Sequence, residues 1–170
     1  MNKLIFTLLL MWTVGYAQTV KFGTPSFQGT VVTLPVDFEY VPPFGSISCK
    51  IWYDSDKYTL IDAVTDPTLL AIGPGMWGTD GITLRYGWFS LGYMSAYSEH
   101  PFYFRLQQNK PGCTPLYWVV SPSDSFIGDI FSNEIPCTFE NSTLCGQKVA
   151  PLPRAHWVNK YNILGQQTRE

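Results

Sequence analysis

An alternation of apolar and polar side chains with a period of two residues is the feature that most constrains the fold of this chain. Within Val32–Tyr40 every second residue is apolar, and the residues between them are polar or proline. Successive side chains of a β-strand point to opposite faces of a sheet, so this stretch predicts a strand with one buried face. Pro35 has no amide hydrogen, so we expect the strand at a sheet edge, or Pro35 where no ladder bond is needed.

The same alternation returns along the chain, with turn-forming residues between the apolar stretches. Further strands are predicted at 46–53, 58–64, 82–86, 102–106 and 116–120. The period within 46–53 directs Trp52 outward beside Lys50, and the continuous apolar run 116–120 suits a strand covered on both faces. No stretch has the apolar period of a helix, and proline and glycine (13 and 14 residues) recur throughout. Short strands separated by turns predict a mainly β chain that folds as an antiparallel β-sandwich over residues 18–120. We expect a disulfide-held extension at 121–147 and a polar tail at 148–170.

Residues 1–17 have the three parts of a secretory signal peptide. Lys3 gives a positive start, the run from Leu4 to Trp12 is uncharged and mostly apolar, and Gly15 and Ala17 are the small residues that precede a cleavage site. The apolar run is shorter than the about 20 residues that span a bilayer as a helix. We therefore expect the signal to be removed before Gln18 and the protein to be secreted into the extracellular space.

Four cysteines are present, and none lies in the predicted signal. An even number of cysteines in an exported chain favours two disulfides, for which three pairings exist. Cys49 is predicted to face inward on a central strand, and Cys113 opens the last predicted strand. The expected pairing is therefore Cys49 with Cys113 and Cys137 with Cys145.

Surface chemistry limits the class of partner. The sequon Asn141-Ser142-Thr143 predicts an N-glycan on Asn141 in a surface loop. The formal net charge is −2, and removal of Lys3 with the signal makes it more negative, which argues against a nucleic-acid partner. The polar tail predicts neither a membrane span nor a glycolipid anchor. We expect an extracellular protein or polysaccharide partner.

Four segments have the cadence of a known type of secreted domain. They are Thr30–Tyr40, Ser46–Tyr53, Ile82–Tyr86 and Pro101–Leu106. With the turn that closes them at residue 112, residues 29–112 resemble an immunoglobulin-like or fibronectin-type β-sandwich. The resemblance implies a small secreted domain of the kind found in cell walls and extracellular matrices.

Candidate catalytic and metal-binding residues are few. His100 and His156 are the only histidines, and no Gly-x-Ser-x-Gly nucleophile motif accompanies them. Asp37 and Glu39 share the outward face of one predicted strand, as paired glycosidase carboxylates could, but any solvated strand has the same pattern. The segment Asp54-Ser55-Asp56 begins like a calcium loop and lacks the glycine and glutamate that complete one. We therefore predict no enzyme activity, no cofactor and no metal.

The segment 75–97 is rich in aromatic residues interspersed with glycine. Tyr86 is expected in the core because of its position in the alternation of its strand. Trp77, Trp88 and Tyr93 are candidate ligand-binding residues, because exposed aromatic rings stack on sugars and anchor protein interfaces. The competing interpretation is that these rings fill the core.

The leading functional hypothesis is a secreted, non-enzymatic glycoprotein that acts as an extracellular matrix or interaction module, including the matrices of shells and cell walls. One alternative is a carbohydrate-binding module, which requires the rings of Trp77, Trp88 and Tyr93 to be exposed and coplanar. Another is a secreted hydrolase, which requires His100 or His156 to meet an acid and a nucleophile in a pocket.

Overall fold

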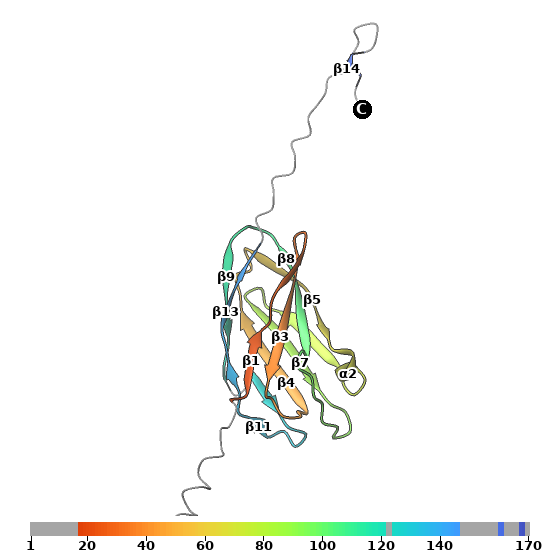
Figure 1. The fold of residues 1–170 in the computed structure, drawn as a ribbon, viewed down its shortest axis with the longest axis vertical. Helices are drawn as coiled ribbons and strands as arrows, with labels where there is room; N and C mark the ends of the chain where they lie inside the picture. Colours follow the sequence, from red (N-terminus) through yellow and green to blue (C-terminus); the bar gives the residue numbers. More distant parts are fainter. Residues whose placement is uncertain (1–16, 122–123, 147–159, 162–166, 169–170) are drawn as a thin grey trace, which may run out of the picture.

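Two β-sheets stacked face to face form the sandwich seen in the computed structural model (Figure 1). The structure describes residues 17–121 and 124–146, together with the backbone of a small separate hairpin of β14 (Lys160–Tyr161) and β15 (Gln167–Thr168). Nearly all of the predicted signal peptide and most of the predicted tail lie outside the described residues. No helix among the described residues is long and apolar enough to cross a bilayer.

The first sheet has six strands in the order β12-β1-β3-β8-β5, with β2 paired to β3. Its strands are β1 (Thr19–Phe22), β2 (Ser26–Gln28), β3 (Val31–Glu39), β5 (Tyr58–Thr65), β8 (Phe102–Gln108) and β12 (Thr138–Phe139). All pairs are antiparallel except β1 with β12. Sequence-distant strands are neighbours here, because β8 lies between β3 and β5.

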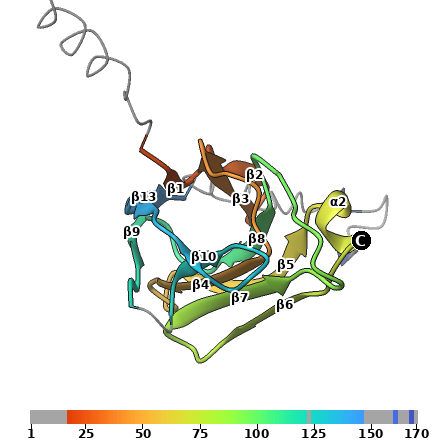
Figure 2. The ribbon, with the colours of Figure 1, turned by 90° about the horizontal axis from the view of Figure 1, so that it is seen from below.

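The second sheet has seven strands in the order β11-β10-β4-β7-β6, and β9 joins it through β4 and carries β13. Its strands are β4 (Ser46–Trp52), β6 (Gly75–Thr79), β7 (Thr83–Phe89), β9 (Cys113–Trp118), β10 (Phe126–Gly128), β11 (Glu134–Ile135) and β13 (Ser142–Cys145). The short helix α2 (Pro67–Leu70) begins where the Asp66 carboxylate accepts a hydrogen bond from the Thr68 amide. Figure 2 shows the two layers end-on, with α2 beside β5.

Along most of β3, the apolar residues of the alternation are buried in the core, as predicted. Its four inward residues are Val32, Leu34, Val36 and Phe38, and all are at most 4% exposed. Tyr40 continues the period in the sequence but is exposed, because the chain leaves the sheet there with a φ of 57°. The antiparallel β-sandwich predicted from the period is confirmed.

Pro35 lies inside the first sheet, not at its edge. On one side of β3, β2 pairs as far as Thr33 and β1 begins pairing at Val36. Pro35 therefore lies opposite the break between these two strands, so its missing amide donor costs no ladder bond. The second of the two expected positions for this proline is the one observed.

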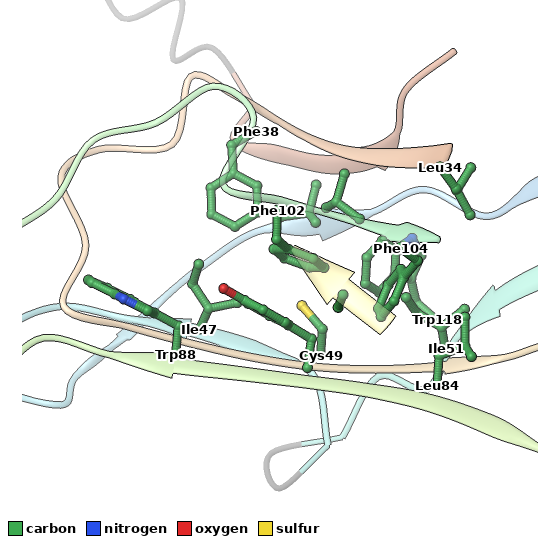
Figure 3. Packing of buried hydrophobic residues seen from close by; sticks show 14 of the residues in the cluster. Leu34, Phe38, Ile47, Cys49, Ile51, Leu84, Trp88, Phe102, Phe104 and Trp118 are labelled. Atoms are coloured by element: carbon green, nitrogen blue, oxygen red, sulfur yellow. The ribbon is translucent and has the colours of Figure 1, made fainter. Parts of the chain in front are cut away.

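The two sheets meet through aromatic and aliphatic side chains that point into one shared core (Figure 3). Tyr86 of β7 stacks on Phe102 of β8, with ring centroids 3.7 Å apart. The Tyr86 hydroxyl lies 2.9 Å from the hydroxyl of Thr65 on β5, which satisfies it inside the core. The predicted core position of Tyr86 is confirmed.

Trp88 belongs to this core, which corrects its expected role as a ligand-binding residue. It is 1% exposed, and its indole Nε1 donates to the carbonyl oxygens of Leu69 and Gly73, both at 3.1 Å. The predicted strand ended at Tyr86, whereas β7 continues to Phe89. Trp88 follows Tyr86 by two residues and therefore faces inward with it.

Residues 126–145 contribute strands to both sheets of the sandwich. β10 pairs with β4, β12 with β1, and β13 with β9. A disulfide joins Cys113 at the start of β9 to Cys145 at the end of β13, which corrects both expected pairings. The local period could not supply this pairing, because it follows from β9 and β13 being neighbours in the sheet.

Replacement of Trp88 by phenylalanine should lower the free energy of unfolding by about 2–3 kcal/mol, since it leaves a cavity and removes the indole hydrogen bonds to the buried carbonyls of Leu69 and Gly73. The matched change Trp77→Phe, at a half-exposed ring of β6, should cost less than about 0.5 kcal/mol. Urea unfolding of both variants measures the difference. Equal losses would contradict the buried, hydrogen-bonded position of Trp88.

Candidate functional site

The outer face of the second sheet carries an open hollow of about 350 Å³. It lies over β4, β7 and β6, on the face that points away from the core. The outer-face side chains around it are those of Ser48, Lys50, Met76, Arg85 and Asp124, and Gly87 lies among them. The exposed apolar side chain of Met76 on β6 therefore lies beside charged ones from β4 and β7.

Strand register explains why the hollow forms here. Gly87 of β7 lies between Ser48 of β4 and Met76 of β6. Because glycine has no side chain, the sheet is left bare at this point and the flanking residues form walls around it. If Gly87 carried a Cβ atom, the nearest atom outside its immediate chain neighbours would be the Ile47 carbonyl oxygen, at 3.8 Å. The space is therefore open to a larger side chain.

Two cations stand next to each other in the hollow, and each has an acidic partner. Lys50 and Arg85 are paired across β4 and β7. The Lys50 Nζ lies 3.2 Å from Asp124 Oδ1, and an Arg85 guanidinium nitrogen lies 3.0 Å from Asp80 Oδ2. The hollow is therefore close to electrically neutral while presenting groups of both signs, which suits a partner with mixed polar and apolar chemistry.

Asp80 orients Arg85 from the turn between β6 and β7. Its carboxylate accepts hydrogen bonds from the Thr83 hydroxyl at 2.8 Å and the Thr83 amide at 2.7 Å, and from the Ile82 amide at 3.1 Å. These bonds, together with Arg85, hold the pKa of Asp80 well below its usual value of 3.8. The Asp80 charge is thus present across the physiological range.

An exposed aromatic pair lies on the same face, beyond the charged row. Trp52 of β4 is paired in register with Tyr117 of β9, and their ring centroids are 5.8 Å apart with an interplanar angle of 35°. Sequence reasoning placed Trp52 outward beside Lys50, as observed. It missed Tyr117, because the run 116–120 was expected to be covered on both faces. In the structure Leu116 and Trp118 point inward and Tyr117 points out.

The three aromatic residues proposed from the sequence do not form one platform. Trp77 on β6 is among the residues around the hollow and is 48% exposed, but its register with the inward Tyr86 directs its side chain to the opposite side of the sheet from Met76. Tyr93 is 79% exposed but lies in the β7–β8 loop, where it lines a different hollow of about 270 Å³ with Phe89 and Ser132. Trp88 is buried. The coplanar arrangement that the carbohydrate-binding hypothesis requires is therefore absent from these three residues.

His100 meets an acid but no nucleophile. Its Nδ1 lies 2.8 Å from Asp37 Oδ1 at the outer face of the first sheet. The nearby Ser98 hydroxyl donates to Asp66 and accepts from the His100 backbone amide, so it is not bonded to the imidazole ring. Glu39, the second candidate carboxylate, forms an ion pair with Lys21 at 2.5 Å. His156 lies outside the described residues.

The sequence stretch that begins like a calcium loop is a tight turn. The Asp56 amide donates to the Asp54 carboxylate at 3.1 Å, and Lys57 pairs with the same carboxylate at 3.3 Å. Within residues 17–121 and 124–146, no group of three or more histidine, cysteine, aspartate or glutamate side chains is placed to hold a metal ion.

Asn141, the predicted glycosylation residue, is exposed in the short connection between β12 and β13. Its side-chain Oδ1 accepts a hydrogen bond from the Trp118 amide at 2.9 Å. The sequon therefore lies at the surface of the sandwich, close to the edge where β13 pairs with β9.

Comparison with known proteins identifies the type of sandwich. A chain of the CaDoc0917–CaCohA2 complex is 19% identical with a TM-score of 0.62, over 77% of this chain and 100% of that one. A cohesin from a type I cohesin–dockerin complex of Clostridium thermocellum is 14% identical with a TM-score of 0.60, over 76% and 99%. A non-cellulosomal cohesin from Archaeoglobus fulgidus is 19% identical with a TM-score of 0.58, over 75% and 89%. The fold is that of a cohesin-like β-sandwich.

The cohesin-like fold refines the resemblance read from the sequence. The sandwich is confirmed, but the similar structures are cohesin domains of the jelly-roll type, so they do not support an immunoglobulin or fibronectin type in particular. No protein-family model and no curated protein sequence matches the chain. The likeness is thus one of backbone architecture at low sequence identity.

Protonation of Asp80 should weaken the turn that orients Arg85. Because the folded-state pKa of Asp80 is depressed, its contribution to stability is present above its usual pKa of 3.8 and is lost as the pH falls through the lower folded-state value. The variant Asp80→Asn should therefore be less stable at pH 7 and should lose less stability than the wild type below about pH 4. Thermal unfolding from pH 7 to pH 2 measures both effects.

The matched control is Asp56→Asn, which changes a more exposed carboxylate in another turn. It should keep the acid dependence of the wild type. An acid dependence of Asp80→Asn identical to that of the wild type would contradict the role given to the Asp80 bonds.

Proposed function

We propose that this chain is a secreted, non-enzymatic module that binds another protein through the outer face of its β10-β4-β7-β6 sheet. The observation that carries the proposal is the hollow over Gly87, a bare stretch of sheet walled by Met76 on one side and Lys50 on the other. A half-exposed apolar wall next to charged side chains is the composition expected of a protein-binding surface.

The similarity to cohesins supports the same class of function. Several of the similar structures are cohesins in complex with dockerins, so this fold is used elsewhere for binding a protein partner. We carry over only that class of function, because fold does not by itself specify a ligand. Overall identities of 7–19% do not extend a dockerin partner to this chain.

Export and glycosylation complete the proposal. The signal-peptide pattern of residues 1–17 and the Cys113–Cys145 disulfide both support an oxidising, extracellular compartment. The exposed Asn141 supports an N-glycan at the edge formed by β9 and β13, away from β6 and β7. A glycan there leaves the hollow accessible.

The binding face is tested by filling the hollow. Gly87→Gln adds a polar side chain where the backbone accepts a Cβ without a clash, so the fold should persist. Immobilised wild-type protein is used to isolate a partner from the medium of the cells that produce it, and the dissociation constant of the purified pair is measured for each variant. Gly87→Gln should weaken binding at least about tenfold, a loss of roughly 1.4 kcal/mol.

The matched control is Thr33→Gln, which places the same side chain on the outer face of the other sheet, on β3. It should leave the dissociation constant unchanged. Equal binding by wild type and Gly87→Gln would place the partner elsewhere. Retention of a polysaccharide and of no protein, lost in Gly87→Gln, would overturn the protein-binding proposal in favour of carbohydrate recognition.

The glycan is tested at a residue other than the acceptor, because Asn141 also bonds to Trp118. Thr143→Ala removes the sequon and keeps that hydrogen bond. Protein secreted from a eukaryotic host should lose mass on treatment with an amidase that removes N-glycans, and the Thr143→Ala protein should not. An unchanged mass for the wild type would contradict glycosylation at Asn141.

A further inference from the structure

Cys113 and Cys145 form a disulfide, and the other two cysteines, Cys49 and Cys137, are free thiols. Cys49 is in the middle of β4, is 2% exposed, and its sulfur points into the core between the sheets (Figure 3). Cys137 is partly buried and packs against the same core. The side chains of both residues pack on the core and point away from the outer face on which the proposed partner binds.

Cys137 lies where the chain crosses from one sheet to the other. β11 pairs with β10 in the second sheet, and β12 pairs with β1 in the first. Cys137 is in the link between them, at the side of the sandwich where both sheets are joined by one continuous segment. Ile135, Cys137 and Phe139 alternate along this segment, and all three pack on the core. The Cys137 side chain therefore shares the inward direction of its two neighbours.

Strand register brings the two thiols to the same level of the sandwich. Ile47 of β4 is paired with Ile127 of β10, which is paired with Ile135 of β11. β4 and β11 are both antiparallel to β10, so they run in the same direction. Two residues after Ile47 comes Cys49, still in β4, and two residues after Ile135 comes Cys137, just beyond the end of β11; both are directed inward. The chain leaves the second sheet after Ile135 and joins the first at Thr138, so Cys137 lies between the sheets and packs on the core into which the Cys49 sulfur points.

The surroundings of the thiols agree with this proximity. Burial raises the pKa of Cys137 to about 11. Burial, and secondly the neighbouring Cys137, raise the pKa of Cys49 well above its usual range. Because the thiolate is the attacking species in disulfide exchange, both groups react slowly once the sandwich is closed. Oxidation is therefore fastest while the chain is folding, before the core excludes the oxidant.

We propose that Cys49 and Cys137 form a second disulfide that joins β4 to the link between β11 and β12. The two thiols reduce a low-molecular-weight disulfide such as glutathione disulfide. One thiolate attacks it and releases a first glutathione thiol, and the second thiolate then attacks the mixed disulfide and releases another. The products are the Cys49–Cys137 bond and two molecules of glutathione, so electrons and protons balance.

The two bonds would act on different parts of the closing segment. Cys113–Cys145 fixes its end, where β13 pairs with β9. Cys49–Cys137 would fix its middle, next to the two-residue parallel pairing of β12 with β1. That pairing is short, so a covalent bond beside it would limit local opening of the edge of the first sheet.

The full chain is unfolded, reduced and refolded with glutathione disulfide, and its peptides are mapped without reduction. A linked peptide pair that contains Cys49 and Cys137, beside the Cys113–Cys145 pair, is the expected result. The proposal would be overturned if an alkylating reagent modified both thiols after unfolding. It would also be overturned if either thiol were linked to Cys113 or Cys145. Addition of the oxidant only after folding should slow formation of the bond by at least about tenfold.

A second measurement separates the new bond from the existing one. In Cys113→Ser/Cys145→Ser, the remaining cysteines form a disulfide only with each other, and oxidation should raise the midpoint of thermal unfolding by roughly 10 °C. In Cys49→Ala/Cys137→Ala, oxidation should raise the midpoint of thermal unfolding only by the contribution of the Cys113–Cys145 disulfide. An oxidant response of the wild type equal to that of Cys49→Ala/Cys137→Ala would also overturn the proposal.

Discussion

The packing of β7 on β8 is the interaction on which the rest of the structure depends. Tyr86 stacks on Phe102 at 3.7 Å, and its hydroxyl is bonded to Thr65 in the same core. This contact joins the second sheet to the first through one aromatic pair of large buried area. Burial, the largest cause, raises the pKa of Tyr86 well above its usual range, so the ring stays neutral and its hydroxyl remains a donor inside the core.

The same contact determines which residues face outward. Because Tyr86 and Trp88 point into the core, Arg85, which precedes Tyr86, must point away from it. Gly87, between Tyr86 and Trp88, occupies an outward position as well. β4 and β6 pair with β7 on either side and add Lys50 and Met76 to that outer face. The hollow is thus a consequence of the core: one glycine on the outward side of the strand that holds the sheets together leaves the sheet bare.

Cohesins with 19% identity or less share this architecture. This fits a fold that is specified by the alternation of apolar and polar residues along its strands more than by particular side chains. Many sequences satisfy the same buried pattern, so the core accepts extensive exchange while the fold persists. The outer face is under no such restriction. Function must therefore be argued from Lys50, Arg85, Met76 and the space over Gly87, and not from the fold alone.

The sequence by itself determined the sandwich, the direction of Cys49 and Tyr86, and the outward position of Trp52, because each follows from the period of two within one strand. It failed where a strand extended beyond its apparent limits, as for Trp88, and where a continuous apolar run concealed the alternation around Tyr117.

Only the tertiary structure decided the disulfide partner of Cys113, the position of Pro35 opposite a strand break, and the meeting of β4, β6 and β7 around Gly87. These features depend on which strands become neighbours. Strand order joins segments far apart in the chain, such as β4 with β10, and a pattern with a period of two residues is the same whichever strand lies beside it.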